Sequence, residues 1–225
     1  TLAREIGYHL ITEHSQKVGW IMLEESLAKS AQALIALDNG VPVGNLTEEP
    51  DLITEEAWQK SYDSLIAPSS FYDSWGSTEV DNIIAKMRYL AIGAECQFIV
   101  LDHVSIVVSG IDTDERKALD ILMTRIRSEV VEATGVGVIA ISHLKRNGNK
   151  ESFNEGGAVS ITDLRGSAGI EQLSDFIIAA ERDQQSDNPC ATKLRVLKNR
   201  PFGSVGLAGH CEYIPETGRL VPTTP

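Results

Sequence analysis

The sequence predicts an α/β fold: a mostly parallel sheet flanked by helices, with an antiparallel extension at the C-terminal end. Apolar, β-branched runs alternate with helical patterns through the first two thirds of the chain, and such alternation is typical of a parallel sheet. Three further strands then follow one another without intervening helices, which favours antiparallel pairing. The chain has 225 residues, 42% of them hydrophobic and 23% charged, which is the balance of a globular protein.

The first half of the chain alternates predicted helices and strands. A helix with one apolar face is expected over 1–16, followed by a buried strand at 18–23. Helix formers fill residues 25–38, and Asn39-Gly40 ends them. Residues 41–50 contain two prolines and are expected to form a loop. The remaining predictions here are a polar helix over 54–64, a short strand near 70–73, a helix ending at about Gly93 and a strand at 97–101.

The second half continues the alternation and then changes character. A long amphipathic helix is predicted over 113–134, with its apolar residues facing inward, and a strand at 136–141 follows. Residues 144–162 are the least regular part of the chain. A short helix over 163–174 precedes the closing strands near 175–181, 192–198 and 205–214. The whole chain, 1–225, is interpreted as a single domain.

Bulk properties narrow the possible functions. A net charge of −12 argues against a globally basic nucleic-acid binder, although a narrow, salt-sensitive basic patch is compatible with it. The three cysteines have no metal-ligand spacing and are expected to be free thiols in a reducing compartment. No apolar run is long enough for a membrane span. The chain opens with Thr1 rather than Met and is expected to be a fragment.

Polar residues follow several of the predicted strands. Glu24, Asp102 and His143 stand at or after strand ends, and Lys198 with Arg200 form a Lys-x-Arg pair at another. The carboxyl ends of parallel strands are where an open α/β sheet binds its ligand. Carboxylates and paired cations there suit phosphoryl transfer. Each has an ordinary alternative: acids in the first turn of the next helix, a turn aspartate, or a structural histidine.

Two basic, glycine-containing segments suit contact with a phosphodiester backbone. Residues 143–150 hold Lys145, Arg146 and Lys150, and Arg165-Gly166-Ser167 stands at a predicted helix start. No aromatic residue interleaves them, so base stacking is not indicated. The alternative is a solvated charged loop. The phosphate-binding loop G-x-x-x-x-G-K-[ST] is absent, since no glycine of this chain is followed by lysine.

Taken together, these residues resemble the DnaB-like hexameric replicative helicases, most closely the ring helicase-primases of short-tailed phages, with the mitochondrial Twinkle proteins as more distant relatives. The resemblance runs in order along nearly the whole chain. It is carried by Met22-Leu-Glu-Glu-Ser26, Leu101-Asp-His-Val-Ser-Ile-Val-Val108, Asp114-Glu-Arg-Lys117, Ser142-His-Leu-Lys145, Val159-Ser-Ile-Thr-Asp-Leu-Arg-Gly-Ser167, Gln172-Leu-Ser-Asp175, Lys198-Asn-Arg200 and Glu212-Tyr-Ile-Pro-Glu-Thr-Gly218.

The resemblance implies a RecA-like P-loop NTPase core that hydrolyses ATP or dTTP with Mg²⁺ and moves along single-stranded DNA in the 5′-to-3′ direction. It also implies a homo-oligomeric ring, a hexamer, with a primase domain and a replicative polymerase as partners, in the cytoplasm of a phage-infected bacterium. The implied roles are a catalytic base at Glu24, a metal-associated acid at Asp102, a γ-phosphate sensor at His143, cations for the neighbour's nucleotide at Lys198 and Arg200 (the finger), nucleotide contacts at Arg182, Tyr213 and Thr1, and DNA contacts at Lys145, Arg146, Lys150, Arg165 and Gly166.

In this family the Gly-Lys-Ser loop stands just before the position of Thr1, so the chain is expected to begin after it and to bind nucleotide poorly by itself. Two other interpretations stay open. One is a RecA-like recombination or loading ATPase that assembles on single-stranded DNA without unwinding it. The other is a catalytically dead, truncated remnant.

Overall fold

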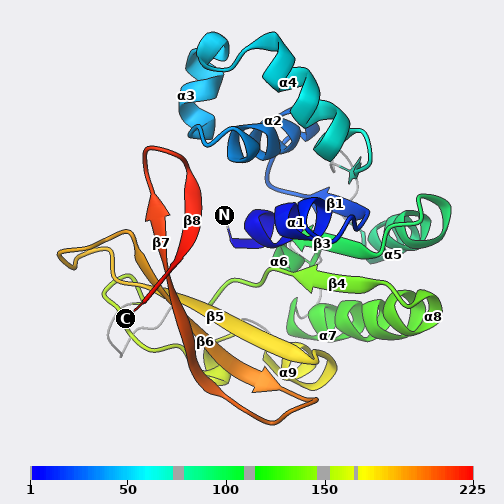
Figure 1. Ribbon diagram of the computed structural model, residues 1–225. Coiled ribbons are helices and arrows are strands. Elements are labelled where there is room, and N and C mark those ends of the chain that lie inside the picture. Colours follow the sequence, from blue (N-terminus) through cyan, green and yellow to red (C-terminus); the bar gives the residue numbers. More distant parts are fainter. Residues whose placement is uncertain (1, 73–78, 109–114, 146–152, 165–166, 225) are drawn as a thin grey trace. The chain divides into compact units, whose positions relative to one another are not determined.

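The structure is a computed structural model that describes residues 2–72, 79–108, 115–145, 153–164 and 167–224 (Figure 1). It divides into two compact units. The first comprises Thr1–Ser142 with Pro215–Arg219, and the second comprises His143–Ile214 with Leu220–Pro225. The interpretation of 1–225 as one functional domain stays a prediction. Among the described residues, no helix is both long and apolar enough to cross a bilayer.

The first unit contains a four-stranded sheet in the order β2-β1-β3-β4, and every neighbouring pair is parallel (Figure 1). The strands are β1 (Val18–Met22), β2 (Ser70–Tyr72), β3 (Phe98–Asp102) and β4 (Gly137–Ala140). All four lie where strands were predicted, and the parallel pairing is confirmed.

Eight α-helices are described in this unit: α1 (Leu2–Thr12), α2 (Leu27–Asp38), α3 (Val43–Glu48), α4 (Glu55–Ser61), α5 (Val80–Arg88), α6 (Val104–Val108), α7 (Glu115–Arg125) and α8 (Glu132–Thr134). A 3₁₀ turn spans Pro50–Leu52, and π-helical turns at Tyr62–Ile66, Tyr89–Gly93 and Ile126–Val131 extend α4, α5 and α7. The long helix predicted over 113–134 is therefore present from Glu115 onward, and its predicted inward residues Leu119, Leu122, Ile126 and Val130 are buried.

The prediction of a loop over 41–50 was wrong, because α3 occupies most of it. Pro42 precedes the helix with a φ of −59°, which is already close to the helical value. The Leu46 N–H donates to the Pro42 carbonyl at 3.1 Å, and the Leu46 side chain is only 3% exposed. Burial of one leucine and the preset proline angle outweigh the loop-like composition. Helix α6 was also not predicted.

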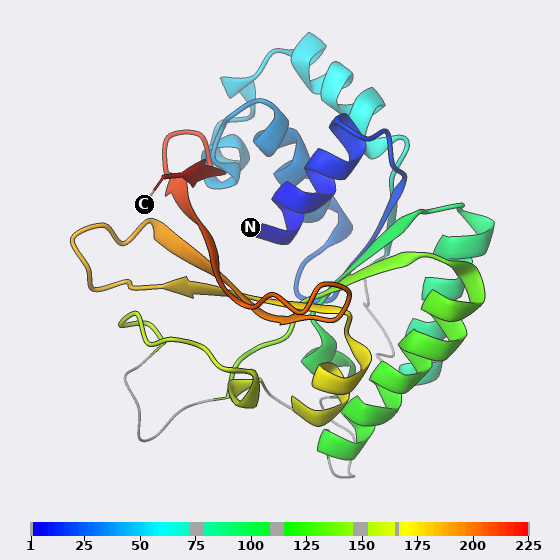
Figure 2. The same cartoon turned by 60° about the horizontal axis from the view of Figure 1, so that its bottom comes forward.

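The two faces of the parallel sheet bury different helices (Figure 2). Val18, Trp20 and Met22 pack against Ile11 of α1 and Leu34 of α2. Alternate residues of the strands point to the opposite face, which α5 to α8 cover. Gly7 permits the close approach of α1, since a Cβ there would lie 2.2 Å from the Trp20 ring.

A part-buried polar network joins α1, α2 and the segment Pro215–Arg219. Arg219 donates to both carboxylate oxygens of Glu5, with the shortest N–O distance 3.0 Å, and its guanidinium lies 4.9 Å from the centre of the Tyr8 ring. The Tyr8 hydroxyl donates to Asp38 at 2.9 Å. Burial and this bond to a carboxylate raise the pKa of Tyr8 to about 12. The network fastens a segment from the far end of the chain onto α1.

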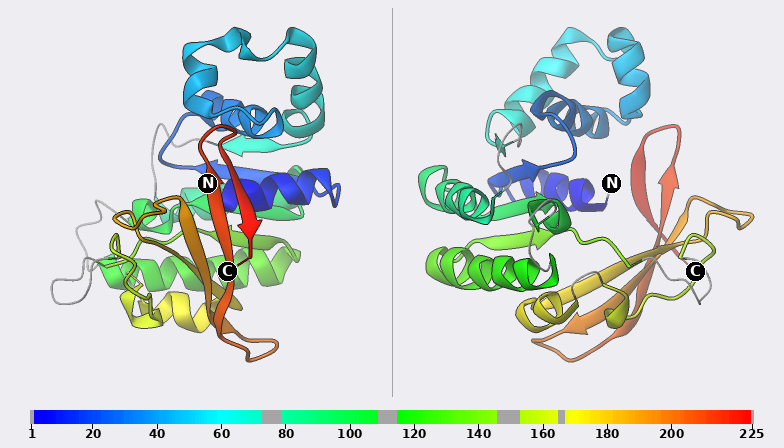
Figure 3. Two further views of the ribbon diagram at one scale, coloured as in Figure 1. Left: turned by 60° about the vertical axis from the view of Figure 1, so that its left-hand side comes forward. Right: turned by 180° about the vertical axis from the view of Figure 1, so that it is seen from behind.

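The second unit contains a sheet in the order β5-β6-β7-β8 (Figure 3, yellow to red). Its elements are a 3₁₀ turn (Ile161–Asp163), α9 (Ser167–Leu173), β5 (Phe176–Arg182), β6 (Ala191–Asn199), β7 (Gly206–Ile214) and β8 (Arg219–Thr223). The pairs β5–β6 and β6–β7 are antiparallel, as predicted. Strand β8 was not predicted, because Pro222 interrupts its strand pattern.

Candidate functional site

The two acidic residues predicted for the site lie at adjacent strand ends in the first unit. Met22, the last residue of β1, is paired in register with Asp102, the last residue of β3. The Leu23 N–H donates to the Asp102 carbonyl at 2.7 Å, so β1 remains paired with β3 up to the residue before Glu24. Parallel strands in this register bring Glu24 and Asp102 to one edge of the sheet, as the sequence predicted.

The neighbouring acids Glu24 and Glu25 have different surroundings. The Glu25 carboxylate is only 13% exposed and accepts hydrogen bonds from Arg4 and, at 2.7 Å, from the Ser30 hydroxyl. The Glu24 side chain is 50% exposed. Neither is a first-turn acid, since α2 begins at Leu27 behind the N-cap Ser26. Glu25 is engaged in a structural ion pair, and Glu24 is the carboxylate that solvent can reach.

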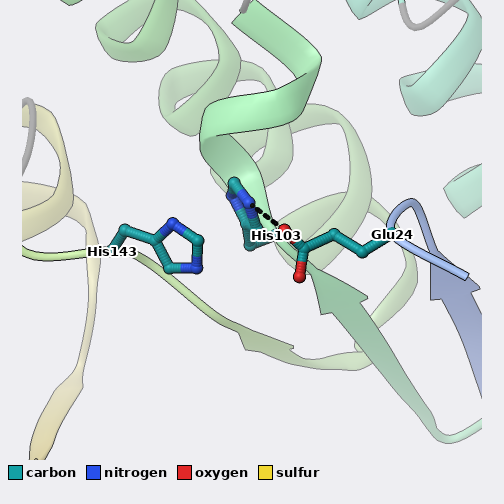
Figure 4. Close-up of side chains that lie close together, drawn as sticks. All are labelled: Glu24, His103 and His143. Atoms are coloured by element: carbon teal, nitrogen blue, oxygen red, sulfur yellow. Dashed lines mark hydrogen bonds and ion pairs between the residues drawn. The ribbon is translucent and has the colours of Figure 1, made fainter.

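His103, which had no predicted role, contacts Glu24. Its Nε2 lies 3.0 Å from Oε1 of Glu24, and its side chain is 6% exposed (Figure 4). The two residues are 79 positions apart in sequence. The only sequence signal was the position of His103 directly after Asp102, at a strand end.

The carboxyl of Asp102 has its pKa raised above the ordinary value. Burial of the group is the largest cause, and the negative charge of Glu24 is the second. The charges of His103 and Arg4 act in the opposite direction. The pKa shift therefore records two carboxylates that lie near enough to repel each other, and a cation at this edge would relieve that repulsion.

His143, the predicted γ-phosphate sensor, is the first residue of the second unit and has an exposed side chain. Lys145 follows two residues later. Its N–H donates to the Asp163 carbonyl at 2.8 Å, and its ammonium donates to the Thr162 carbonyl at 2.9 Å. A β-bridge also pairs Leu144 with Leu164.

The predicted DNA contacts thus start from neighbouring points of the backbone. One predicted segment begins at Lys145 and the other directly follows Leu164, and the bridge holds these two starting points together. The other predicted contacts Arg146, Lys150, Arg165 and Gly166, with the nucleotide contact Thr1, lie outside the described residues. Their roles stay predictions.

A buried acid on β5 anchors the chain that returns from the first of these segments. Glu181 has a side chain that is 3% exposed, accepts from the Val159 N–H at 2.8 Å and pairs with Arg195 at 2.6 Å. Burial by itself would raise the pKa of Glu181, but the hydrogen bonds from Arg195 and Val159 lower it below its ordinary 4.5. Glu181 was not predicted as a site residue, although its position continues the alternation that buries Ile177 and Ala179.

Replacing Glu181 by glutamine is expected to lower the free energy of unfolding by about 1–3 kcal/mol at neutral pH, because Arg195 loses its charged partner. A carboxyl with a lowered pKa stabilises the fold above pH 4.5, and this stabilisation disappears as the pH falls through the folded-state value. Urea unfolding at several pH values should therefore show the difference shrinking in acid. Glu212→Gln, on β7 with its carboxylate bonded to the amide of Asn188, is the matched control. Equal losses in both variants would contradict the anchoring role.

The two predicted phosphate-facing cations are held at the end of α9. Lys198 donates to the carbonyl of Glu171, and Arg200 donates to the carbonyl of Gln172. Arg200 also lies 3.6 Å from the carboxylate of Asp175, and 46% of its side chain is exposed. Burial, followed by the charge of Arg200, lowers the pKa of Lys198. The two cations are therefore neighbours, and the guanidinium remains accessible.

The predicted base contacts Arg182 and Tyr213 lie toward the same end of the antiparallel sheet. Arg182 is paired with Thr192, which is in turn paired with Cys211, two residues before Tyr213. The Arg182 side chain is exposed and donates to the carbonyl of Pro189. The Tyr213 N–H donates to the carbonyl of Cys190 at 3.0 Å. Arg182 is therefore exposed, and Tyr213 is partly buried.

Comparisons with known sequences agree on one group of proteins. The family described as the DnaB-like helicase C terminal domain matches residues 1–214. The DNA helicase/primase of Enterobacteria phage T3 is 44% identical over 213 residues, which cover 93% of this chain but only 38% of that protein. This chain therefore spans well under half of that relative.

Two solved structures share the fold at low sequence identity. The ATPase domain of G40P superposes with a TM-score of 0.75 at 19% identity, covering 98% of this chain and 79% of that one. A DnaB-like replicative helicase, studied together with its interactions with primase, superposes with a TM-score of 0.73 at 19% identity, covering 93% of this chain and 51% of that one. These likenesses confirm the RecA-like α/β fold.

Proposed function

Because this chain belongs to the family of DnaB-like helicase C-terminal domains, we propose that it is the motor domain of an NTP-dependent replicative DNA helicase. It hydrolyses NTP to move along single-stranded DNA in the 5′-to-3′ direction and to unwind duplex DNA. The observation that carries this proposal is the pairing of an accessible carboxylate, Glu24, with a half-buried one, Asp102, at neighbouring strand ends.

In this proposal Glu24 accepts a proton from the water that attacks the γ-phosphate. Its exposure allows it to reach a solvent molecule, whereas Glu25 is already occupied by Arg4 and Ser30. Asp102 lies close by but would not compete for the proton, because its oxygens would hold the divalent cation. The different roles of Glu24 and Asp102 in this proposal follow from their different exposure to solvent.

The donor set fits a divalent cation. Carboxylate oxygens are the ligands that Mg²⁺ prefers, and Glu24 lies near enough for its charge to raise the pKa of the Asp102 carboxyl, after burial as the larger cause. When bound with ATP or dTTP, Mg²⁺ supplies neutralisation of the phosphate charge. Asp102 is the residue that would hold it.

Lys198 and Arg200 serve the nucleotide of an adjacent copy in this proposal. The Gln172 carbonyl orients the guanidinium of Arg200, and the side chain stays accessible because 46% of it is exposed. A site completed by a neighbour requires a head-to-tail assembly, which is either a closed ring or an open filament, and a hexameric ring is the assembly that we propose. Lys145 and the residues at 146, 150, 165 and 166 contact the phosphates of single-stranded DNA.

The proposed partners follow the relatives. The phage T3 protein is described as both helicase and primase, and the second solved structure concerns interactions with primase. We therefore expect a primase activity and a replicative polymerase to work with this domain, in the cytoplasm of a phage-infected bacterium.

The proposal is tested on the protein expressed from its complete reading frame. Hydrolysis of ATP and dTTP is measured with and without single-stranded DNA. Strand displacement is measured on forked duplexes in which either the 5′ arm or the 3′ arm is left single-stranded. We expect hydrolysis to be stimulated by DNA and displacement to require the single-stranded 5′ arm. Hydrolysis without displacement on either fork would favour a loading or recombination ATPase, and the absence of both would indicate a dead remnant.

A further inference from the structure

The side chain of His103 is buried in the first unit, whereas the side chain of its partner Glu24 is half exposed. The imidazole is 6% exposed and directly precedes α6, whose residues Val104, Val107 and Val108 are each about 1% exposed. The Val104 N–H donates to the Ile141 carbonyl at 3.0 Å, which ties this turn to the end of β4. Glu24, in contrast, is half exposed on the connection between β1 and α2.

From this contrast we infer that His103 is a positioning residue for Glu24, an inference that rests on the proposed role of Glu24 as the base. A carboxylate can only accept hydrogen bonds, so Nε2 of the imidazole donates its N–H to Oε1 across 3.0 Å (Figure 4). One oxygen of Glu24 is thereby occupied, and Oε2 is left to accept from water. The buried ring selects the rotamer and the working oxygen of an otherwise mobile side chain.

Such positioning acts on turnover rather than on nucleotide affinity. A long, half-exposed side chain samples several rotamers, and only some of them place an oxygen beside the attacking water. A displacement of about 1 Å at a reacting group can cost about 100-fold in rate. His103 itself does not touch the reacting atoms, so its loss should change kcat and leave KM nearly constant.

Two amide variants make a matched pair for the test. In His103→Gln the amide nitrogen reaches about as far as Nε2, and in His103→Asn it stops one carbon short. We expect H103N to lower kcat for DNA-stimulated NTP hydrolysis by about 10- to 100-fold, with KM changed less than about threefold, and H103Q to recover most of the rate. A purely structural role would instead lower the melting temperature of both variants and affect them alike.

A double-mutant cycle separates this inference from the proposed function. In a Glu24→Gln background, H103N should cause no further loss of kcat, because the residue that it positions is already disabled. Full additivity of the two losses, or wild-type kcat in H103N, would overturn the role of His103 while wild-type hydrolysis and its loss in E24Q still support the function. A wild-type protein without hydrolysis would overturn both.

Discussion

Replacing Arg200 by alanine is expected to lower NTP turnover by about 10³–10⁵-fold while nucleotide affinity changes little, as for other arginine fingers. The side chain is 46% exposed, and its bonds to the Gln172 carbonyl and to Asp175 orient it without burying it. Its charge would act on the transition state of a neighbouring site. Arg127→Ala, which removes a surface arginine paired with Glu132, is the control and should leave turnover intact.

Mixing two inactive variants tests whether Arg200 acts in trans. Arg200→Ala retains the proposed base Glu24, and Glu24→Gln retains the proposed finger Arg200. In a mixed ring, the site of an R200A subunit is complete when the neighbour that lends it an arginine is an E24Q subunit, because the first supplies Glu24 and the second supplies Arg200. Co-assembled variants should therefore regain a measurable fraction of wild-type hydrolysis. If the mixture stays as inactive as its components, the trans assignment of Arg200 fails.

Replacing Glu24 by glutamine is expected to lower kcat by about 10²–10⁴-fold, the usual contribution of a positioned general base. Because half of the side chain is exposed, the free energy of unfolding should barely change. Steady-state hydrolysis with single-stranded DNA present, together with urea unfolding, measures both quantities.

The adjacent Glu25→Gln is the matched control, with the opposite expected pattern. Its carboxylate is 13% exposed and bonded to Arg4 and Ser30, so its loss should cost about 1–3 kcal/mol of stability. Turnover of the folded variant should remain near that of the wild type. If E25Q abolished turnover and E24Q preserved it, the two acids would exchange roles.

The parallel sheet and the edge that carries Glu24 and Asp102 could be predicted because both depend on local patterns. An apolar run followed by a polar residue fixes where a buried strand ends, and parallel pairing aligns those ends. Short elements escaped prediction where a single tertiary contact decides them. Helix α3 depends on the burial of Leu46, and β8 tolerates Pro222 inside its strand.

The partners of the site residues could not be predicted, because they are distant in sequence. His103 meets Glu24 across 79 positions, and Glu25 meets Arg4 across 21. The local sequence favours Glu24 over Glu25 only because Glu24 stands nearer the strand end, whereas the bonds of Glu25 to Arg4 and Ser30 are visible only in the structure. The burial of Glu181 was accessible in principle from strand alternation, but a charged residue on a buried face becomes plausible only when its partner Arg195 is known.

Helix α9 begins directly after the predicted DNA contacts at 165–166, and the carbonyls of Glu171 and Gln172 near its other end hold both cations at the end of β6. A helix of seven residues is about 10 Å long, so α9 spans the short distance from the predicted DNA contacts to the carbonyls that hold the two cations. With the proposed roles, this one helix connects the DNA contacts of a subunit to the cations that serve the nucleotide of the next subunit, so DNA binding and hydrolysis would be coupled between neighbouring subunits.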